Sequence, residues 1–576
     1  YNTAVGGEAL QTNIDGDKNT AIGFRALKSF EADTDGHGNN TAVGSNAAEN
    51  MSTGTENVAI GLQAIGAGVT TGNNNIAVGV SAGLYLTAGS DNILIGSYAG
   101  DNLDAGTRNI AIGRSALSAE NAHGYNVAIG YEALKVQDAG ADAYNTAIGY
   151  QTGLNVSSGQ RNTIMGGLAG DALTTGSDNV AIGYGALSAE DTGGKNVAVG
   201  KGALGTLDVG GDGYNVAIGY YSGLAMTSGN SNVTIGYNCA YQLTTGDSNI
   251  AIGTNAMLAA NGSESRNVAI GNGALQNMDN DGSNYNVAVG WNAGNDVTTG
   301  TYNTLVGALA GDELIGGQSN TVLGAEALGA ETGGSQNVAV GSQALKVSDG
   351  GSNNVAVGRQ AGVAVSTGDN NTLIGNNAGD SLTGGGSNTI IGYNVDTGAP
   401  SGSNQIIIGA GFTSSLGSNT TEIGTTTTTK AIVHGLVKPT NETNANVATA
   451  LPNNIYVFSD ADGATVTLPD SGAGAYLGAT VEFIIKTTAT SNSHKIILSD
   501  TTNEKFVGAV ATIDTDNDNA ATFYTPATAN KAITMNGTTT GIAGSRIRVT
   551  NIAADIWSVE GTILHTGNTA TPFSNS

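Results

Sequence analysis

The chain has 576 residues, including 89 glycines, 6 prolines and 1 cysteine, and its formal net charge is −27. This length exceeds that of one ordinary domain, and an aromatic content of 5% is too low for a large conventional core. The negative charge argues against nucleic acid and anionic membrane surfaces as partners, and no apolar run approaches the roughly 18 residues of a membrane span. A lone cysteine, Cys239, excludes an internal disulfide framework.

A five-residue phrase, an Asn followed four residues later by Gly, recurs along residues 1–424. It has 23 copies between Asn2 and Asn388, and two looser copies begin at Asn404 and Asn419. The 24 intervals between Asn2 and Asn419 cover 417 residues, a mean of about 17.4. A fixed period of this length predicts a solenoid of stacked coils. With a rise of about 4.8 Å per coil, the predicted shaft is roughly 120 Å long.

Each copy has the composition of a β-strand followed by a turn. The residue after the Asn is β-branched in all 23 copies, the middle residue is mostly Ala, and another small residue stands three positions past the Gly. We expect a strand, a tight turn, a short second strand and a polar return, with the β-branched residues packed against bulky neighbours. The small rows suit close chain-to-chain packing, and stacking sets the asparagines in an amide ladder. Representative repeat positions are Asn19, Ile22, Gly23, Ala26, Asn57, Ile60, Gly61, Ala64, Asn126, Ile129, Gly130, Ala133, Asn215, Ile218 and Gly219.

The repeats also show a second, longer periodicity of about four coils, which we call the four-coil beat. Intervals of 19 follow Asn126, Asn196 and Asn267, which lie 70 and 71 residues apart. Duplication of four-coil blocks explains this beat most simply. The alternative is that the longer acidic loops 138–144, 208–214 and 279–285 form a spaced row of contact sites.

The C-terminal part has a different composition. Residues 425–430 form a Thr-rich linker, and residues 431–576 have no period. Eight β-rich runs, at 454–459, 464–468, 480–487, 495–499, 505–513, 521–524, 546–551 and 556–560, predict an antiparallel sandwich of jelly-roll type with Trp557 in its core. An acidic turn supplies candidate tip contacts at Asp514, Asp516, Asn517, Asp518 and Asn519.

No catalytic or metal-binding constellation stands out. The five histidines, His37, His123, His434, His494 and His565, have no metal-ligand spacing along the sequence, and no calcium-binding repeat is present. We therefore expect no enzyme activity, no cofactor and no metal. Paired carboxylates of a glycan-cleaving tailspike need only spatial proximity, so that alternative stays open.

The phrase Asn-Thr/Val-Ala-Ile/Val-Gly, with its small residue three past the Gly, resembles the head repeat of trimeric autotransporter adhesins. The resemblance covers residues 1–424 and implies a left-handed parallel β-roll with three chains about a common axis. The period here is longer than that family's usual repeat of about 14 residues. A β-rich domain also stands where the family has a coiled-coil stalk and a membrane anchor. A roll followed by a β-rich end domain also resembles fibres of tailed bacteriophages, as does the ending at 561–568.

These observations favour a homotrimeric extracellular fibre on a virion surface, a tail or head fibre that attaches to a host cell-surface glycan or protein. Its other partners would be virion or filament subunits. The runner-up is a bacterial surface adhesin or extracellular filament subunit, and a tailspike is third. The sequence opens inside the first repeat, at Tyr1, and we expect the natural protein to extend further. A signal peptide there would favour the adhesin, and a virion-docking domain the phage fibre.

Overall fold

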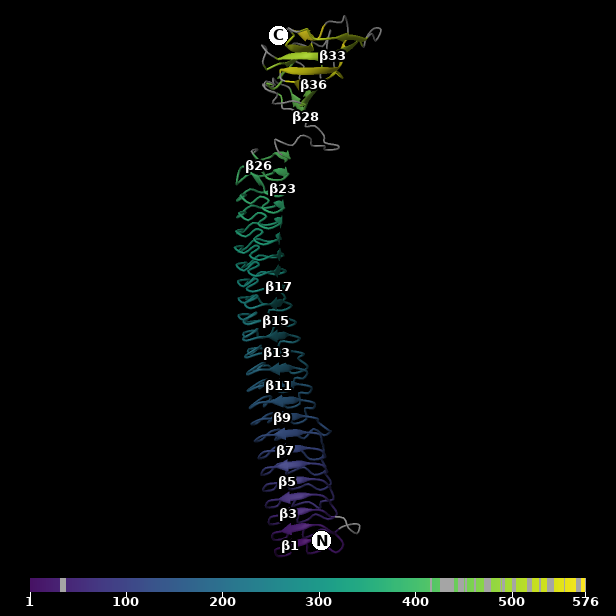
Figure 1. Cartoon of the computed structure of the whole chain (residues 1–576), viewed down its shortest axis with the longest axis vertical. Helices are drawn as coiled ribbons and strands as arrows, with labels where there is room; N and C mark the ends of the chain where they lie inside the picture. Colours follow the sequence, from purple (N-terminus) through teal and green to yellow (C-terminus); the bar gives the residue numbers. More distant parts are fainter. Residues whose placement is uncertain are drawn as a thin grey trace. The chain divides into compact units, whose positions relative to one another are not determined.

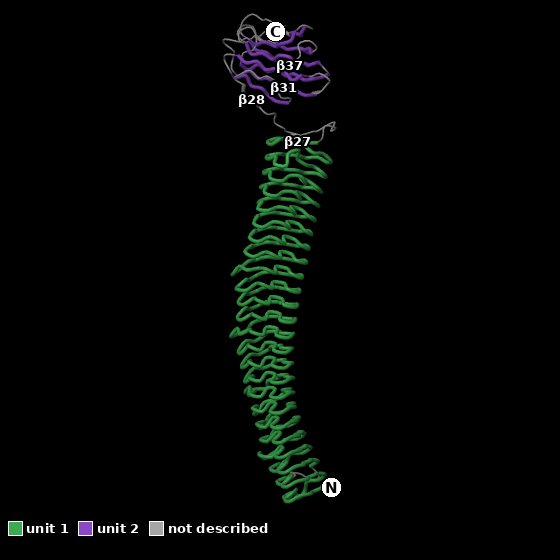
Figure 2. Tube along the Cα trace, turned by 90° about the vertical axis from the view of Figure 1, so that its left-hand side faces the viewer, with its two compact units in different colours: residues 1–431 green, residues 432–576 purple. Residues whose placement is uncertain are grey.

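The fold is known from a computed structural model, which shows two compact units, residues 1–431 and 432–576. Figure 1 shows unit 1 as a rod of stacked coils, and Figure 2 shows that this rod is gently curved. The described residues are 1–31, 38–414, 417–424, 440–443, 450, 453–459, 463–470, 478–486, 488, 493–499, 504–514, 521–527, 530–535, 543–553, 555–565 and 571–574. Every regular element among them is a β-strand, so the all-β prediction is confirmed.

Twenty-five strands of unit 1 form one parallel sheet along the rod. They are β1 Thr3–Val5, β2 Thr20–Ile22, β3 Thr41–Val43, β4 Val58–Ile60, β5 Ile76–Val78, β6 Ile93–Ile95, β7 Ile110–Ile112, β8 Val127–Ile129, β9 Thr146–Ile148, β10 Thr163–Met165, β11 Val180–Ile182, β12 Val197–Val199, β13 Val216–Ile218, β14 Val233–Ile235, β15 Ile250–Ile252, β16 Val268–Ile270, β17 Val287–Val289, β18 Thr304–Val306, β19 Thr321–Leu323, β20 Val338–Val340, β21 Val355–Val357, β22 Thr372–Ile374, β23 Thr389–Ile391, β25 Ile406–Ile408 and β27 Thr421–Ile423. Each strand pairs with the same position of the next coil, as Thr3 pairs with Thr20 and Val197 with Val216. The predicted parallel solenoid is therefore confirmed.

The middle residue of each short strand faces into the coil. In β2 to β23 this residue is buried, whereas its two β-branched or aliphatic neighbours are half-buried or exposed. The second small row, which includes Ala26 and Ala133, is also fully buried inside the coil. The expectation that small rows serve chain-to-chain packing is therefore wrong. The coil interior combines these small rows with larger buried side chains such as Leu27 and Leu86, whereas the β-branched strand residues point outward.

The leg opposite the strand is a run of turns in most coils, so the expected second strand is absent from them. Alternate residues there have left-handed backbone angles, with φ of 57° at Arg25 and 47° at Leu27, which an extended strand does not allow. Their N–H groups still bond to adjacent coils, since Leu27 N donates to Ala47 O at 3.0 Å. Within the described coils, a second strand forms only near the end of the array, where β24 Val395–Thr397 pairs with β26 Phe412–Ser414.

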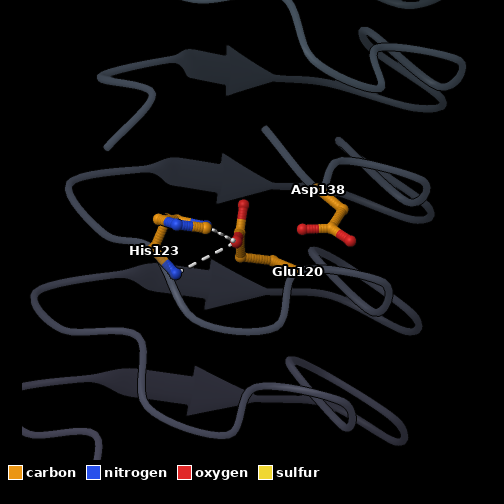
Figure 3. Close-up of side chains that lie close together, drawn as sticks. All are labelled: Glu120, His123 and Asp138. Carbon is orange, nitrogen blue, oxygen red and sulfur yellow. Dashed lines mark hydrogen bonds and ion pairs between the residues drawn. The ribbon is translucent and has the colours of Figure 1, made fainter. Parts of the chain in front are cut away.

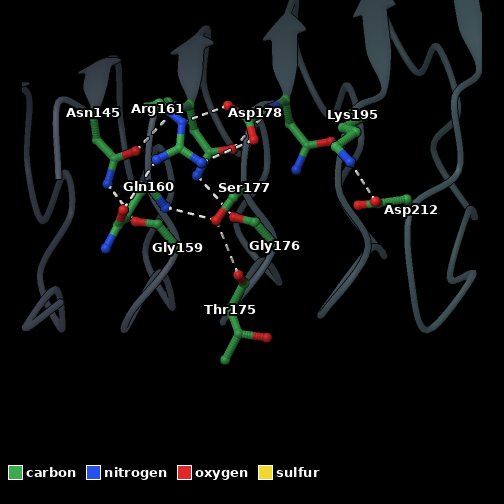
Figure 4. Close-up of polar contacts among 12 residues, drawn as sticks. Asn145, Gly159, Gln160, Arg161, Thr175, Gly176, Ser177, Asp178, Lys195 and Asp212 are labelled. Atoms are coloured by element: carbon green, nitrogen blue, oxygen red, sulfur yellow. Dashed lines mark hydrogen bonds and ion pairs between the residues drawn. The ribbon is translucent and has the colours of Figure 1, made fainter.

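A ladder of buried asparagines joins the coils, as predicted. The Asn162 Oδ1 accepts the backbone N–H of Asn179 at 2.9 Å, and its Nδ2 donates to Gly176 O at 2.9 Å. The Asn145 amide makes the same pair of bonds with Asn162 N and Gly159 O, and Figure 4 shows the one to Gly159. The ladder thus fixes both the next strand and the return loop, rather than joining amide to amide alone.

The Gly that ends each phrase lies where neighbouring backbones meet. Gly23 has φ of 136°, and a Cβ there would stand 2.3 Å from Gly44 O in the next coil. Any other residue would therefore have to displace the adjacent coil. This explains why Gly holds this position in every copy.

The four-coil beat has a packing basis. Where the inner strand residue is Leu94 or Ile164, glycines face it across the coil. A Cβ on Gly83 or Gly100 would lie 2.8 Å from a methyl carbon of Leu94, and Ile164 stands in the same way over Gly153 and Gly170. Leu94 and Ile164 each fill the space that two glycines leave, so the bulky inner residue of the four-coil block has a packing role.

Unit 2 is a two-sheet β-structure around its own core. Its strands are β28 Thr440–Thr443, β29 Ile455–Phe458, β30 Thr465–Thr467, β31 Thr480–Ile485, β32 His494–Ile497, β33 Lys505–Asp514, β34 Ala521–Tyr524, β35 Ala532–Met535, β36 Arg546–Ala553, β37 Ile556–His565 and β38 Phe573–Ser574. A seven-stranded sheet has the order β28-β29-β31-β36-β37-β33-β34, and a four-stranded sheet the order β30-β32-β35-β38. Side chains of both sheets, including the fully buried Trp557, form one apolar cluster.

All eight predicted strands of this unit are present, together with β28, β35 and β38. The pairing is mixed rather than wholly antiparallel. The ten-residue strand β33 pairs in parallel with β37, and β29 pairs in parallel with β31, whereas β36 is antiparallel to both β31 and β37. The prediction of an all-β unit with two sheets around one core is thus confirmed, whereas the prediction of antiparallel pairing throughout is wrong for these parallel pairs.

Candidate functional site

The outward face of the 25-stranded sheet is apolar along the rod, and we call it the apolar strand face. It consists of the first and third residues of each strand. In strands β1 to β23 the first residue is Thr, Val or Ile, and the third is Val, Ile, Leu or Met. The third residues are substantially exposed, for example Ile22 at 40%, Ile218 at 39% and Leu323 at 51%. Soluble proteins rarely leave an apolar surface of this extent uncovered, so this face is the strongest candidate interface of the chain.

Beside this face runs a ridge formed by the residues that immediately precede the ladder asparagines. They adopt left-handed angles and stack from coil to coil. Tyr125 and Tyr144 stack with ring centroids 4.9 Å apart, and Arg161 pairs with Asp178 at 2.6 Å. In Figure 4 this ridge continues to Lys195, whose Nζ lies 2.6 Å from Asp212 Oδ2. Several of these exposed charges are paired with a charge of a neighbouring coil, so the ridge is a solvated border of the apolar strand face.

The long acidic loops are tied to the coil that precedes them. Asp142 Oδ1 accepts the Gly124 N–H at 3.0 Å, and Asp281 Oδ1 accepts the Ser263 N–H at 2.9 Å. Asp212 pairs with Lys195, as described above. These carboxylates therefore have structural partners, and the idea of a row of contact sites stays a prediction.

Eleven residues past each ladder asparagine, the return leg places a side chain into the coil interior. This interior row is mostly apolar, and Leu103, Leu173, Leu243 and Leu314 are fully buried in it. Glutamates occupy the row at Glu120, Glu190 and Glu331, and all three are also fully buried. A buried carboxylate needs donors or a cation, so its surroundings decide its role.

Glu190 and Glu331 find donors within the chain. Glu190 Oε1 accepts the Gly193 N–H at 2.6 Å and its Oε2 accepts the Val209 N–H at 3.3 Å. Glu331 Oε1 accepts the N–H groups of Gly333, Gly334 and Gly350, and its Oε2 accepts the Ser348 hydroxyl at 2.7 Å. These two glutamates thus fasten their return loops.

Glu120 is different, because His123 stands beside it. Glu120 Oε1 accepts the His123 N–H at 3.1 Å and lies 3.4 Å from His123 Nδ1, whereas Oε2 has no hydrogen-bond partner among the described residues. Asp138, one coil further on, completes a group whose possible ligand atoms all lie within 4.8 Å of one another. In Figure 3 the Glu120 carboxylate lies between the imidazole of His123 and the carboxylate of Asp138. Burial raises the pKa of Glu120.

The linear sequence conceals this triad. His123 has no metal-ligand spacing to another histidine, and Asp138 lies 18 positions after Glu120. In a solenoid, residues one period apart lie side by side, so the spacing i, i+3, i+18 is a compact group here. Applying the coil period to the carboxylates would have found it.

Cys239 occupies a small-residue position, as expected, and is fully buried. Its Sγ donates to Ala251 O at 3.0 Å, and burial raises the thiol pKa to about 12. A thiol in this state is protonated at neutral pH and unreactive. Cys239 is therefore a packing residue of the coil.

Asp312, on the return leg of the β18 coil, gives a prediction for pH dependence. Burial raises its pKa from 3.8 to about 6. A raised folded-state pKa means that the folded chain holds this proton more tightly, so the stabilisation is full below pH 3.8 and is lost as pH rises through about 6. We expect Asp312→Asn to reduce the gain in thermal midpoint between pH 7 and pH 5, as measured by circular dichroism. Glu56→Gln, which removes an exposed carboxylate far along the array, should leave that gain unchanged. An equal gain in wild type and Asp312→Asn would contradict the assignment.

The sequence-based tip contacts lie largely outside the described residues. Asp514 ends β33, but its side chain is not described, and Asp516, Asn517, Asp518 and Asn519 belong to the part that the structure does not describe. His37 and His434 also lie there. In the described part of unit 2, Arg548 bridges Glu482 at 2.9 Å and Glu560 at 3.1 Å on the seven-stranded sheet.

Comparison with known proteins assigns no family or function to the chain, so a functional proposal has to rest on the fold and on these sites. No family model, curated protein or solved structure matches the chain. None of the described residues belongs to a helix with the length and apolarity that crossing a bilayer requires.

Proposed function

We propose that the chain is the subunit of a homotrimeric extracellular fibre, with the solenoid as its shaft. The apolar strand face carries this proposal, because it runs the length of the array without a charged residue in strands β1 to β23. Copies of the same chain offer a matching cover, since identical coil spacing lets the faces meet in register. The number of three chains rests on the resemblance of the repeat to the heads of trimeric adhesins.

The fibre would belong to the virion of a tailed bacteriophage, where it holds its end domain toward a host cell-surface glycan or protein. A rod of stacked coils separates its two ends, and a compact β-sandwich in the same chain supplies a second surface. The net charge of −27 suits an extended extracellular particle, because like charge opposes clumping of neighbouring fibres.

Light scattering on the purified full chain tests the assembly. We expect a mass of three times 57.1 kDa, because three apolar faces can close around one axis. A single-chain mass of 57.1 kDa at micromolar concentration would contradict the trimer.

The second candidate is a bacterial surface adhesin or a filament subunit, which the same exposed face would also serve. Gold-labelled antibodies against the purified chain distinguish these origins in electron micrographs. Labelled fibres on virions support the phage fibre, whereas label on uninfected cells or on free filaments supports the second candidate.

A glycan-cleaving tailspike is the third candidate, because solenoid surfaces can bring carboxylates of different coils together. Its test is the release of reducing ends from a panel of host polysaccharides. Release that is lost on heating the chain would favour this candidate over a purely adhesive role.

A further inference from the structure

We propose that Glu120, His123 and Asp138 bind one divalent transition-metal cation of the zinc class. This site is independent of how the chain assembles, because all three residues belong to adjacent coils of one chain (Figure 3). An imidazole nitrogen with two carboxylates is a ligand set that zinc accepts, with water in a remaining position.

Glu120 is the central residue of the argument. It is fully buried at a position of the interior row where Leu103 and Leu173 stand in other coils. Its Oε2 is buried without a hydrogen-bond partner among the described residues. An ionised carboxylate in such surroundings needs an opposite charge, and a cation between Glu120, His123 and Asp138 would supply it.

The equivalent glutamates find protein donors for both carboxylate oxygens. Glu190 and Glu331 each accept a glycine N–H of their own loop, and a second donor comes from the next coil, Val209 N–H or the Ser348 hydroxyl. Glu190 also lies close to the carboxylates of Asp191 and Asp208, but that group contains no imidazole. The position of His123 is glycine in both cases, and a Cβ on Gly193 or Gly334 would lie within 2.6 Å of the glutamate carboxylate. In the coils of Glu190 and Glu331 the carboxylate therefore packs against the backbone of that glycine. In the coil of Glu120 the residue at this position is His123, which places an imidazole beside the carboxylate.

Asp138 allows the group to close around an ion. It begins the long loop 138–144 and its side chain is exposed, so it can move toward Glu120 and His123 at little cost. The possible ligand atoms already lie within 4.8 Å of one another, so a small movement of Asp138 is enough to bring all three onto one ion. Binding would therefore draw the start of this loop onto the coil.

The test is calorimetric titration of the EDTA-treated full chain with Zn²⁺ alone. We expect one site per chain that Glu120→Leu removes and that His123→Gly weakens by about 100-fold or more, because loss of even an outer-shell partner costs 10–100-fold. Leu and Gly are the residues found at these positions in other coils, so both variants should fold. Glu331→Leu is the matched control and should keep the site. The remaining histidines are unchanged in every variant, so the difference isolates the triad.

Thermal unfolding gives a second readout. Zn²⁺ should raise the midpoint of the wild type and leave that of Glu120→Leu unchanged, and in EDTA Glu120→Leu should be at least as stable as the wild type. Equal Zn²⁺ binding by wild type, Glu120→Leu and His123→Gly would overturn the proposal. So would a wild type that binds Ca²⁺ or Mg²⁺ here but not Zn²⁺, or no metal at all.

Discussion

Two glutamates on the apolar strand face should separate the proposed trimer into single chains. In the double variant Ile218→Glu/Ile270→Glu, each chain would carry two charges into an interface from which water is excluded. Each unpaired buried charge costs several kcal/mol, and like charges of neighbouring chains add repulsion. Both side chains are more than one third exposed in the single chain, at 39% and 36%, so the coil itself should tolerate the change.

Light scattering and circular dichroism measure this effect together. We expect a mass of 57.1 kDa with an unchanged β-sheet spectrum. The matched control is Val136→Glu/Val347→Glu, because these exposed residues lie on return legs rather than on the strand face, and it should keep the wild-type mass. If the double variant on the strand face also keeps that mass, the face is not the interface.

Removing one rung of the asparagine ladder should destabilise the solenoid strongly. Asn162→Ala leaves the buried Asn179 N–H and the Gly176 carbonyl without their partners. Each unsatisfied buried group costs about 1–3 kcal/mol, so we expect a loss of about 2–6 kcal/mol in the free energy of unfolding. Because stability in a repeat array is a sum of neighbouring-coil terms, the damage should centre on the coils of β9 to β11.

Urea unfolding and hydrogen exchange would measure the size and the place of this loss. Asn155→Ala is the matched control, since Asn155 is exposed and its bond to Asp171 O lies at the surface. We expect a change of less than about 0.5 kcal/mol for the control. Similar losses in the two variants, or a loss spread evenly over the array, would contradict the ladder's role.

Most of the fold of unit 1 could be predicted from the period of the repeat. In a solenoid each residue contacts the residue at the same position of the next coil, so a repeat that keeps its register shows which residues are neighbours. The contacts of the Asn side chains and of the Gly backbones could therefore be predicted from the sequence, and with them the parallel sheet and the asparagine ladder. The fit of Leu94 over Gly83 and Gly100 was less accessible, because it joins different positions across the coil interior.

The direction of the side chains could not be read from the phrase. Alternation says that Ala21 and Ile22 face opposite ways, but not which of the two faces the interior. The answer depends on how the opposite leg packs, and that leg is a run of turns with left-handed angles at Arg25 and Leu27. The same turns removed the expected second strand.

In unit 2 the longer strands were predictable from alternation, whereas their partners were not. Thr480–Ile485 alternates between half-buried and buried residues along its length. Parallel pairing of β33 with β37 joins segments about 50 residues apart, for which the sequence carries no local signal. The short strands β35 and β38 lack enough alternating residues to be recognised.

The measurement that tests the account most directly is a cryo-EM reconstruction of the native particle or filament that carries this chain. We expect a threefold shaft of three solenoids, with the first and third residues of each strand packed around the common axis and residues 431–576 at one end. Single solenoids with the apolar strand face against solvent would contradict it. So would a fibre in which a different chain covers that face.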